Sequence, residues 1–275
     1  MTPDTNATHL PADTVLAKIP ARMPLYLLGR VTTRVDKDGP ALYIHWADRA
    51  PARYPFSRIC RVITSPRVAW TSRALMGCVE QHIPIVFLDA AGEPLAYLTA
   101  TVENPSRLDG QIEEFVDRPD WPEQFDHWLR AERMRAIDAW LTQQSAAGHT
   151  VTQHDYLELV HMQIYQWEQA ESSLQGQSIF NGALAALAAD RIEKAGLKIR
   201  YIGYAGQTLD LASTLAKLLA LRLALEMHGL GTTATGEPAA LLRILHAFND
   251  KLHEACRQIL GRLHRRVKEI NELWQ

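Results

Sequence analysis

Three side chains with metal-ligand chemistry recur at helical spacing near the middle of the chain. His154, Glu158 and His161 lie at positions i, i+4 and i+7, so a helix would carry them on one side. Asp155 stands beside the first of them, and Glu168 follows two turns after the last. Imidazoles and carboxylates in this arrangement can share a divalent metal ion, but a polar helix face exposed to water has the same pattern. Both interpretations stay open.

A second candidate site lies where a loop containing two glycines leads into a helix. The loop reads Tyr-Ile-Gly-Tyr-Ala-Gly at 201–206, Asp190 and Glu193 precede it, and Asp210 follows it. A carboxylate in the first turn of a helix is stabilised by the helix dipole without any catalytic role. Asp210 is therefore either a cap or a site residue. The sequence has no glycine-rich phosphate loop, no serine or cysteine nucleophile with a placed base, and no paired-cysteine zinc motif.

Two predicted helices hold this loop. Gly196 stands where a left-handed residue would end the first helix. Apolar residues recur at helical spacing on both sides, at Ala183, Leu184, Leu187, Ala188 and Ile192 before the loop and at Leu209, Leu211, Leu215, Leu218 and Leu219 after it. A helix, a tight loop and a second long helix are the predicted frame for any chemistry here.

The N-terminal part of the chain predicts a flexible tail followed by a small β-rich domain. Residues 1–20 lack sustained periodicity, which is typical of a mobile or peripherally docked tail. Short apolar runs separated by turn residues predict strands within 21–102, beginning with an antiparallel meander. Thr71 or Ser72 can cap the one helix among them.

The rest of the chain, residues 103–275, predicts an all-α domain, which makes the whole fold α+β. Its further helices are expected at 106–117, from near Pro122, from Thr152 or Gln153 to about Leu174, and after Pro238. The last of these repeats apolar residues every three or four positions and therefore lies along a seam. Periodicity leaves open whether that seam lies within one subunit or between two.

Basic side chains gather on two of these helices. The net charge is −2 and the pI about 6.6, so binding to nucleic acid would need a local basic patch. The candidate DNA-binding residues are Arg130, Arg133 and Arg135 on one helix and Arg257, Arg262, Arg265, Arg266 and Lys268 on the other. Such residues can meet phosphates with release of counterions. A solvated basic helix end is the other interpretation.

The cysteines and the hydropathy pattern indicate the compartment. Cys60, Cys78 and Cys256 are odd in number and widely separated, as expected for single thiols in a reducing environment. The start of the chain lacks signal-peptide features, and no window approaches the roughly 18 apolar residues of a spanning helix. A soluble cytoplasmic protein without membrane contact is therefore expected.

Several segments together are more specific than any single motif. In the β-rich part they are Tyr54–Ile59, Val68–Leu75, Ile83–Asp89 and Gly92–Ala96, and in the helical part Asn181–Leu184, Lys194–Leu197 and Tyr201–Tyr204. This combination resembles the CRISPR-associated Cas1 family, the integrase that inserts captured DNA into CRISPR arrays. The resemblance implies a homodimer joined through the β-rich domain at 21–102. It also implies binding of double-stranded or branched DNA and of a small ferredoxin-like partner, with Mg or Mn held by Glu, His and Asp in an active member.

The sequence departs from the family where the metal ligands are implied. The histidine position of the family falls on Gly206 and the aspartate position on Ala212. The glutamate element has no clear match, and Glu168 and Glu171 are only loose substitutes. Because glycine and alanine side chains offer no ligand atom, the leading interpretation is a Cas1-like DNA-binding or assembly protein of spacer acquisition without the nuclease and integrase site.

Two other interpretations remain. One is an active metal-dependent endonuclease or integrase whose ligands have moved, with Asp210 and Glu168 as catalytic candidates and His154, Glu158 and His161 as metal candidates. The other is a structural subunit that pairs with an active homologue. No residue is assigned as catalytic or as a metal ligand.

Overall fold

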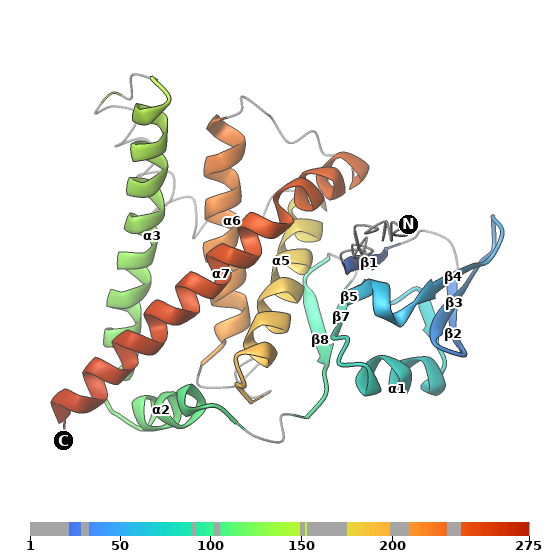
Figure 1. Ribbon diagram of the computed structural model, residues 1–275, viewed down its shortest axis with the longest axis horizontal. Helices are drawn as coiled ribbons and strands as arrows, with labels where there is room; N and C mark the ends of the chain where they lie inside the picture. The colour runs from blue at the N-terminus through green and yellow to red at the C-terminus, as the bar shows by residue number, and fades with distance from the viewer. Residues whose placement is uncertain are drawn as a thin grey trace, which may run out of the picture.

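The computed structural model describes residues 22–28, 33–89, 92–101, 105–148, 152, 175–198, 209–229 and 238–274. Strands occupy the N-terminal part and helices the C-terminal part, which confirms the predicted α+β class (Figure 1). The predicted tail, the helix expected up to about Leu174 and the loop at 201–206 lie outside these ranges. No helix in the described ranges is long and apolar enough to cross a membrane.

Two four-stranded sheets form the N-terminal part. The first runs in the order β1 (Met23–Leu27), β5 (Ile59–Thr64), β7 (Ile85–Leu88), β8 (Pro94–Leu98). The second runs in the order β4 (Ala52–Pro55), β3 (Ala41–Trp46), β2 (Thr33–Asp38), β6 (Val68–Trp70). The meander predicted from strands at 25–28, 31–35 and 42–46 is wrong in its first strand: the antiparallel meander is β2, β3 and β4, and β1 pairs in parallel with β5. Leu25 and Leu27 are buried by that pairing, which local sequence does not reveal.

The predicted helix of the β-rich part is α1 (Ser72–Glu80), which follows the short 3-10 helix η1 (Phe56–Arg58). Thr71 is its N-cap, because its hydroxyl accepts a hydrogen bond from the Ala74 N–H at 3.3 Å. Ala74 and Cys78 of this helix pack into the same apolar core as Val35 and Ile85. The helix thereby joins strands of both sheets.

Five helices follow in the described ranges. They are α2 (Arg107–Val116), α3 (Trp121–Ala146), α5 (Gln175–Lys194), α6 (Leu211–Gly229) and α7 (Pro238–Trp274). Gly196 has φ +73 just after α5, as the sequence predicts for a left-handed C-cap. The apolar seam of α7, including Leu252, Cys256 and Ile259, is buried against α5, α6 and α2 of the same chain. The seam is therefore intramolecular.

Helix α5 lies between the other helices and the first sheet (Figure 1). Ala186 packs there with Ile63, Val86 and Leu88. At Gly182, an added Cβ would lie 2.6 Å from a Leu88 methyl and 3.1 Å from the Gly92 carbonyl oxygen, so the sheet and the helix approach closely. The β-rich and helical parts share this interface, and a boundary between two domains near residue 102 stays a prediction.

Candidate functional site

Helix α2 holds the segment that leads into the loop after α5. Asp109 is 1% exposed, and its carboxylate accepts the Lys198 backbone N–H at 2.9 Å and pairs with Lys198 Nζ at 2.9 Å. The Ser106 N–H donates to the Gly196 carbonyl at 2.9 Å. The start of the loop is therefore held by hydrogen bonds and an ion pair to the N-terminal end of α2. The helices on both sides of the loop, α5 and α6, are those predicted from the sequence.

Asp210, at the other end of the loop, caps α6. Its carboxylate accepts the Ser213 N–H at 2.8 Å, and its carbonyl accepts the Thr214 hydroxyl at 2.8 Å. The residue is exposed, so a capping role accounts for its position in the first turn. The capping interpretation is sufficient, and the carboxylate is also open to solvent beside the loop.

Tyr97 of β8 lies near Asp210, and Glu93 comes just before this strand. Burial raises the pKa of Tyr97 above its ordinary value, and the nearby Asp210 and Glu93 carboxylates raise it further, so the phenol stays neutral. Glu93 accepts a hydrogen bond from the Asn181 side chain at 3.1 Å. Tyr97 and Glu93 were not predicted as site residues, because only tertiary packing brings them close to Asp210 and Asn181.

Ala212, at the position where the resemblance predicts an aspartate ligand, does not fit a metal centre. Its side chain is 0% exposed and lies in one apolar core with Leu209, Leu211 and Leu215. A methyl group supplies no ligand atom, and carboxylates are the ligands that Mg and Mn prefer. Gly206, which also lacks a ligand atom, is outside the described residues.

The other metal candidates have no described position. His154, Glu158, His161 and Glu168 fall between residues 152 and 175, outside the described ranges. Within the described ranges, no group of three or more His, Cys, Asp or Glu side chains is placed to hold a metal ion. The metal hypothesis for this helix therefore stays a prediction.

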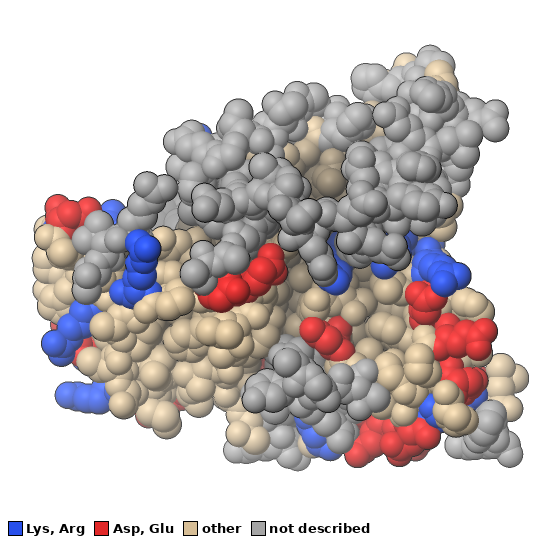
Figure 2. Space-filling model, turned by 180° about the vertical axis from the view of Figure 1, so that it is seen from behind, with Lys and Arg blue, Asp and Glu red and all other residues tan. Residues whose placement is uncertain are grey.

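Many of the predicted DNA-binding residues pair with acidic residues of the chain itself. The pairs are Arg130 with Asp126, Arg135 and Arg262 with Glu132, Arg257 with Glu254, Arg266 with Glu269, and Lys268 with Glu272. Arg265 is exposed, and no described acidic residue pairs with it. On the face in Figure 2, Lys and Arg form small separate groups with Asp and Glu between them. DNA binding by these residues stays a prediction.

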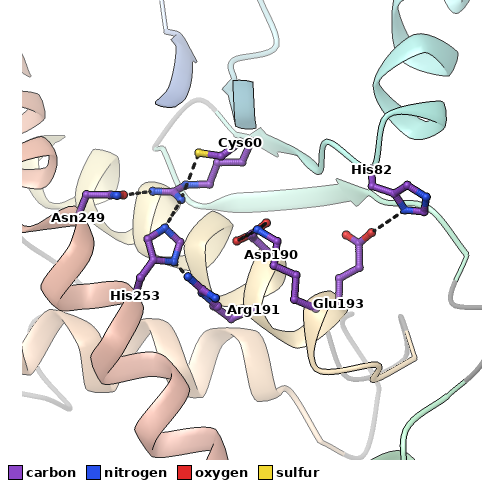
Figure 3. Close-up of polar contacts among 9 residues, drawn as sticks. Cys60, His82, Asp190, Arg191, Glu193, Asn249 and His253 are labelled. Carbon is purple, nitrogen blue, oxygen red and sulfur yellow. Dashed lines mark hydrogen bonds and ion pairs between the residues drawn. The ribbon is translucent and has the colours of Figure 1, made fainter. Parts of the chain in front are cut away.

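A different polar cluster joins the first sheet to the helices (Figure 3). Arg61 of β5 is 3% exposed, and its guanidinium contacts His253 Nε2 at 3.1 Å and donates to Asn249 Oδ1 at 3.1 Å. Arg191 of α5 donates from Nε to His253 Nδ1 at 2.7 Å. We call Arg61, Arg191, Asn249 and His253 the junction cluster. This cluster was not predicted from the sequence, although an arginine within the apolar run of β5 indicates a buried charge that needs polar partners.

The junction cluster keeps its histidine neutral. Burial, together with the positive charges of Arg61, Arg191 and Lys194, lowers the pKa of His253 from 6.5 to about 3. Burial also raises the pKa of the adjacent Cys60 thiol, so this group is not a thiolate nucleophile. The junction cluster therefore contains no activated nucleophile among its described residues. Its main chemical feature is the positive charge of its two arginine side chains.

Acidification is expected to destabilise the protein through His253. The unfolded ring binds a proton near pH 6.5, whereas the folded ring binds one only near pH 3. Proton uptake on unfolding therefore lowers stability as the pH falls through this window, by at most about 1.4 kcal/mol per pH unit. Urea denaturation between pH 7 and 4 should show a shallower loss for His253→Gln than for the wild type. Parallel profiles would mean that the folded ring titrates normally.

Comparison with known proteins places this fold. The sequence profile described as CRISPR associated protein Cas1 matches residues 26–175. No curated protein sequence matches the chain. Among solved structures, the Cas1 protein TM1797 from Thermotoga maritima has a TM-score of 0.61 at 12% identity, covering 89% of this chain and 96% of that one.

Two further structures are similar. A chain of the TtCas1-DNA complex has a TM-score of 0.54 at 13% identity, with 87% of this chain and 91% of that chain covered. A chain of a Cas6-RT-Cas1--Cas2 complex has a TM-score of 0.57 at 13% identity, with 90% of this chain and 35% of that chain covered. At such identities the structures show a shared fold. Because the profile match spans more than half of the sequence, this chain belongs to the CRISPR associated protein Cas1 family.

Proposed function

We propose that this protein is a DNA-binding and assembly component of CRISPR spacer acquisition that lacks the metal-dependent nuclease and integrase site of its family. The observation that carries the proposal is Ala212, whose buried methyl group stands at the aspartate position and offers nothing to a metal ion. Gly206 at the histidine position has the same deficiency. Without these two ligands, one before α6 and one in its first turn, the chain offers no side chain at either position to hold a metal that would activate a nucleophile.

Binding partners follow from the family. Similar structures include a complex of TtCas1 with DNA and a Cas6-RT-Cas1--Cas2 complex. We therefore assign double-stranded or branched DNA as the ligand. A homodimer formed through the β-rich part, a small ferredoxin-like adaptation partner and a cytoplasmic location complete the proposal.

The proposal is tested by measuring DNA binding and DNA cleavage on the same preparation. Duplex and branched DNA should bind with an affinity that falls steeply with salt, without nicking or strand transfer when Mg or Mn is added. Arg265→Glu combined with Arg266→Glu should weaken binding and reduce the salt slope by about 2. Arg243→Glu, at an exposed arginine earlier on the same helix, is the matched control.

Two results would contradict it in different ways. Metal-dependent nicking that Asp210→Asn or Glu168→Gln abolishes would favour an active enzyme with relocated ligands. Asparagine caps a helix as well as aspartate does, so loss of activity in Asp210→Asn would be chemical rather than structural. The absence of any DNA binding at low salt, together with co-purification of an active homologue, would favour a structural subunit.

A further inference from the structure

The junction cluster holds two guanidinium groups that lack an acidic partner. No carboxylate in the described ranges lies within ion-pair distance of Arg61 or Arg191, which instead share one imidazole (Figure 3). Arg61 is 3% exposed, and its Nε is buried without a hydrogen-bond partner. Buried charges in proteins are normally paired with opposite charge, so this cluster has an unmet need for an anion.

None of the described acidic groups near the cluster forms an ion pair with Arg61 or Arg191. Burial keeps the Cys60 thiol and the Tyr26 phenol neutral by raising the pKa of each. The buried Asp190 carboxylate pairs with Lys194 at 2.6 Å. Glu254 pairs with Arg257 at 2.7 Å. The thiol and the phenol are therefore neutral. The Asp190 and Glu254 carboxylates are each paired with another cation, although Glu254 also interacts electrostatically with Arg191.

The His253 imidazole can accept a hydrogen bond from only one of the two arginines that contact it. A neutral ring has one nitrogen that accepts a hydrogen bond and one that carries a hydrogen. His253 faces a guanidinium at both nitrogens, at 2.7 Å from Arg191 and 3.1 Å from Arg61, so one of the two contacts sets donor against donor. A negatively charged oxygen beside these residues would offset that repulsion.

Arg191 of α5 is one of the partly exposed members of the cluster. Within the described ranges only its Nε is hydrogen-bonded, which leaves the two Nη groups open. Lys194, one turn later, has a side chain that is 54% exposed, and its ammonium group has further N–H donors besides the one that pairs with Asp190. A planar guanidinium fork beside an ammonium group is suited to the tetrahedral oxygens of phosphate.

We propose that the junction cluster binds a phosphate group, which the Arg191 fork and Lys194 contact directly while the buried Arg61 supplies positive charge behind them. The inference deepens the proposed function, since it adds a phosphate contact outside the two predicted basic sets. The phosphate belongs either to DNA or to free phosphate, and the chemistry of recognition is the same for both.

Calorimetric titration with inorganic phosphate tests the site directly. The wild type should bind phosphate saturably, and Arg191→Gln should weaken binding about tenfold, as expected for losing charged hydrogen bonds. Arg191→Lys, which keeps the charge but not the fork, should lie between them. Arg243→Gln removes an exposed arginine elsewhere and should bind like the wild type. Thermal unfolding of each variant without phosphate controls for loss of structure.

A parallel titration with duplex DNA identifies the source of the phosphate. If Arg191→Gln weakens DNA binding as well, DNA supplies the group, and if only phosphate binding changes, free phosphate does. Phosphate binding without any DNA binding would defeat the proposed function and leave this site standing. Equal phosphate affinity of Arg191→Gln and Arg243→Gln, or no saturable phosphate binding by the wild type, would overturn the inference even if DNA binds.

Discussion

Glu132→Ala is expected to lower the free energy of unfolding by about 3–5 kcal/mol. Glu132 of α3 is 1% exposed, and Arg262 of α7 donates to its two oxygens at 2.9 and 2.8 Å. Arg135 binds the same carboxylate from the next turn. Removing Glu132 leaves the Arg262 charge at the packed contact between α3 and α7 without its counterion. Urea denaturation at pH 7 measures the effect.

Two controls separate this buried pair from ordinary surface pairs. Glu254→Ala removes an exposed carboxylate that pairs with Arg257 and should leave the urea midpoint almost unchanged. The double variant Glu132→Leu with Arg262→Met should recover most of the stability lost in Glu132→Ala, because the one charge left without its partner is that of Arg135, whose side chain is 52% exposed to water. A small effect of Glu132→Ala would show that water reaches Arg262 and replaces the lost acceptor.

Ala212→Asp, which restores the residue type implied by the family, is expected to destabilise the protein by at least about 3 kcal/mol. Ala212 is 0% exposed and packs among Leu209, Leu211 and Leu215, so a carboxylate there is buried without a partner. Ser213→Asp is the matched control, since it lies in the same first turn but is partly exposed. The helix dipole should make that substitution close to neutral.

The same pair of variants probes the lost metal site. Mg or Mn should not raise the melting temperature of Ala212→Asp relative to Ser213→Asp, because the position predicted for the histidine ligand is Gly206, which has no ligand atom in its side chain. A selective stabilisation of Ala212→Asp by either metal, or the appearance of DNA nicking, would show that the remaining ligands are present. That result would contradict the proposal that the site has been lost.

Local patterns in the chain predicted much of the fold. The apolar repeat of α7, the C-cap at Gly196 and the Thr71 cap of α1 were confirmed, because each depends on residues within a few turns of one another. The meander was misassigned at β1, whose pairing with β5 joins residues far apart in the sequence. Pairing between distant strands depends on which apolar faces are buried together in the folded chain, and a local sequence pattern does not contain that information.

The candidate site also has some features that residue types determine and others that only tertiary packing determines. The sequence alone determined that Gly206 and Ala212 lack ligand atoms, since this is a property of the residue types. Only the tertiary structure decided that Ala212 faces an apolar core and that predicted phosphate contacts such as Arg262 pair with acidic residues of this chain. It also decided that Arg61 meets His253 across 192 positions. Side-chain chemistry is fixed by residue type, whereas the partner and the dielectric around each charge are set by packing between distant segments.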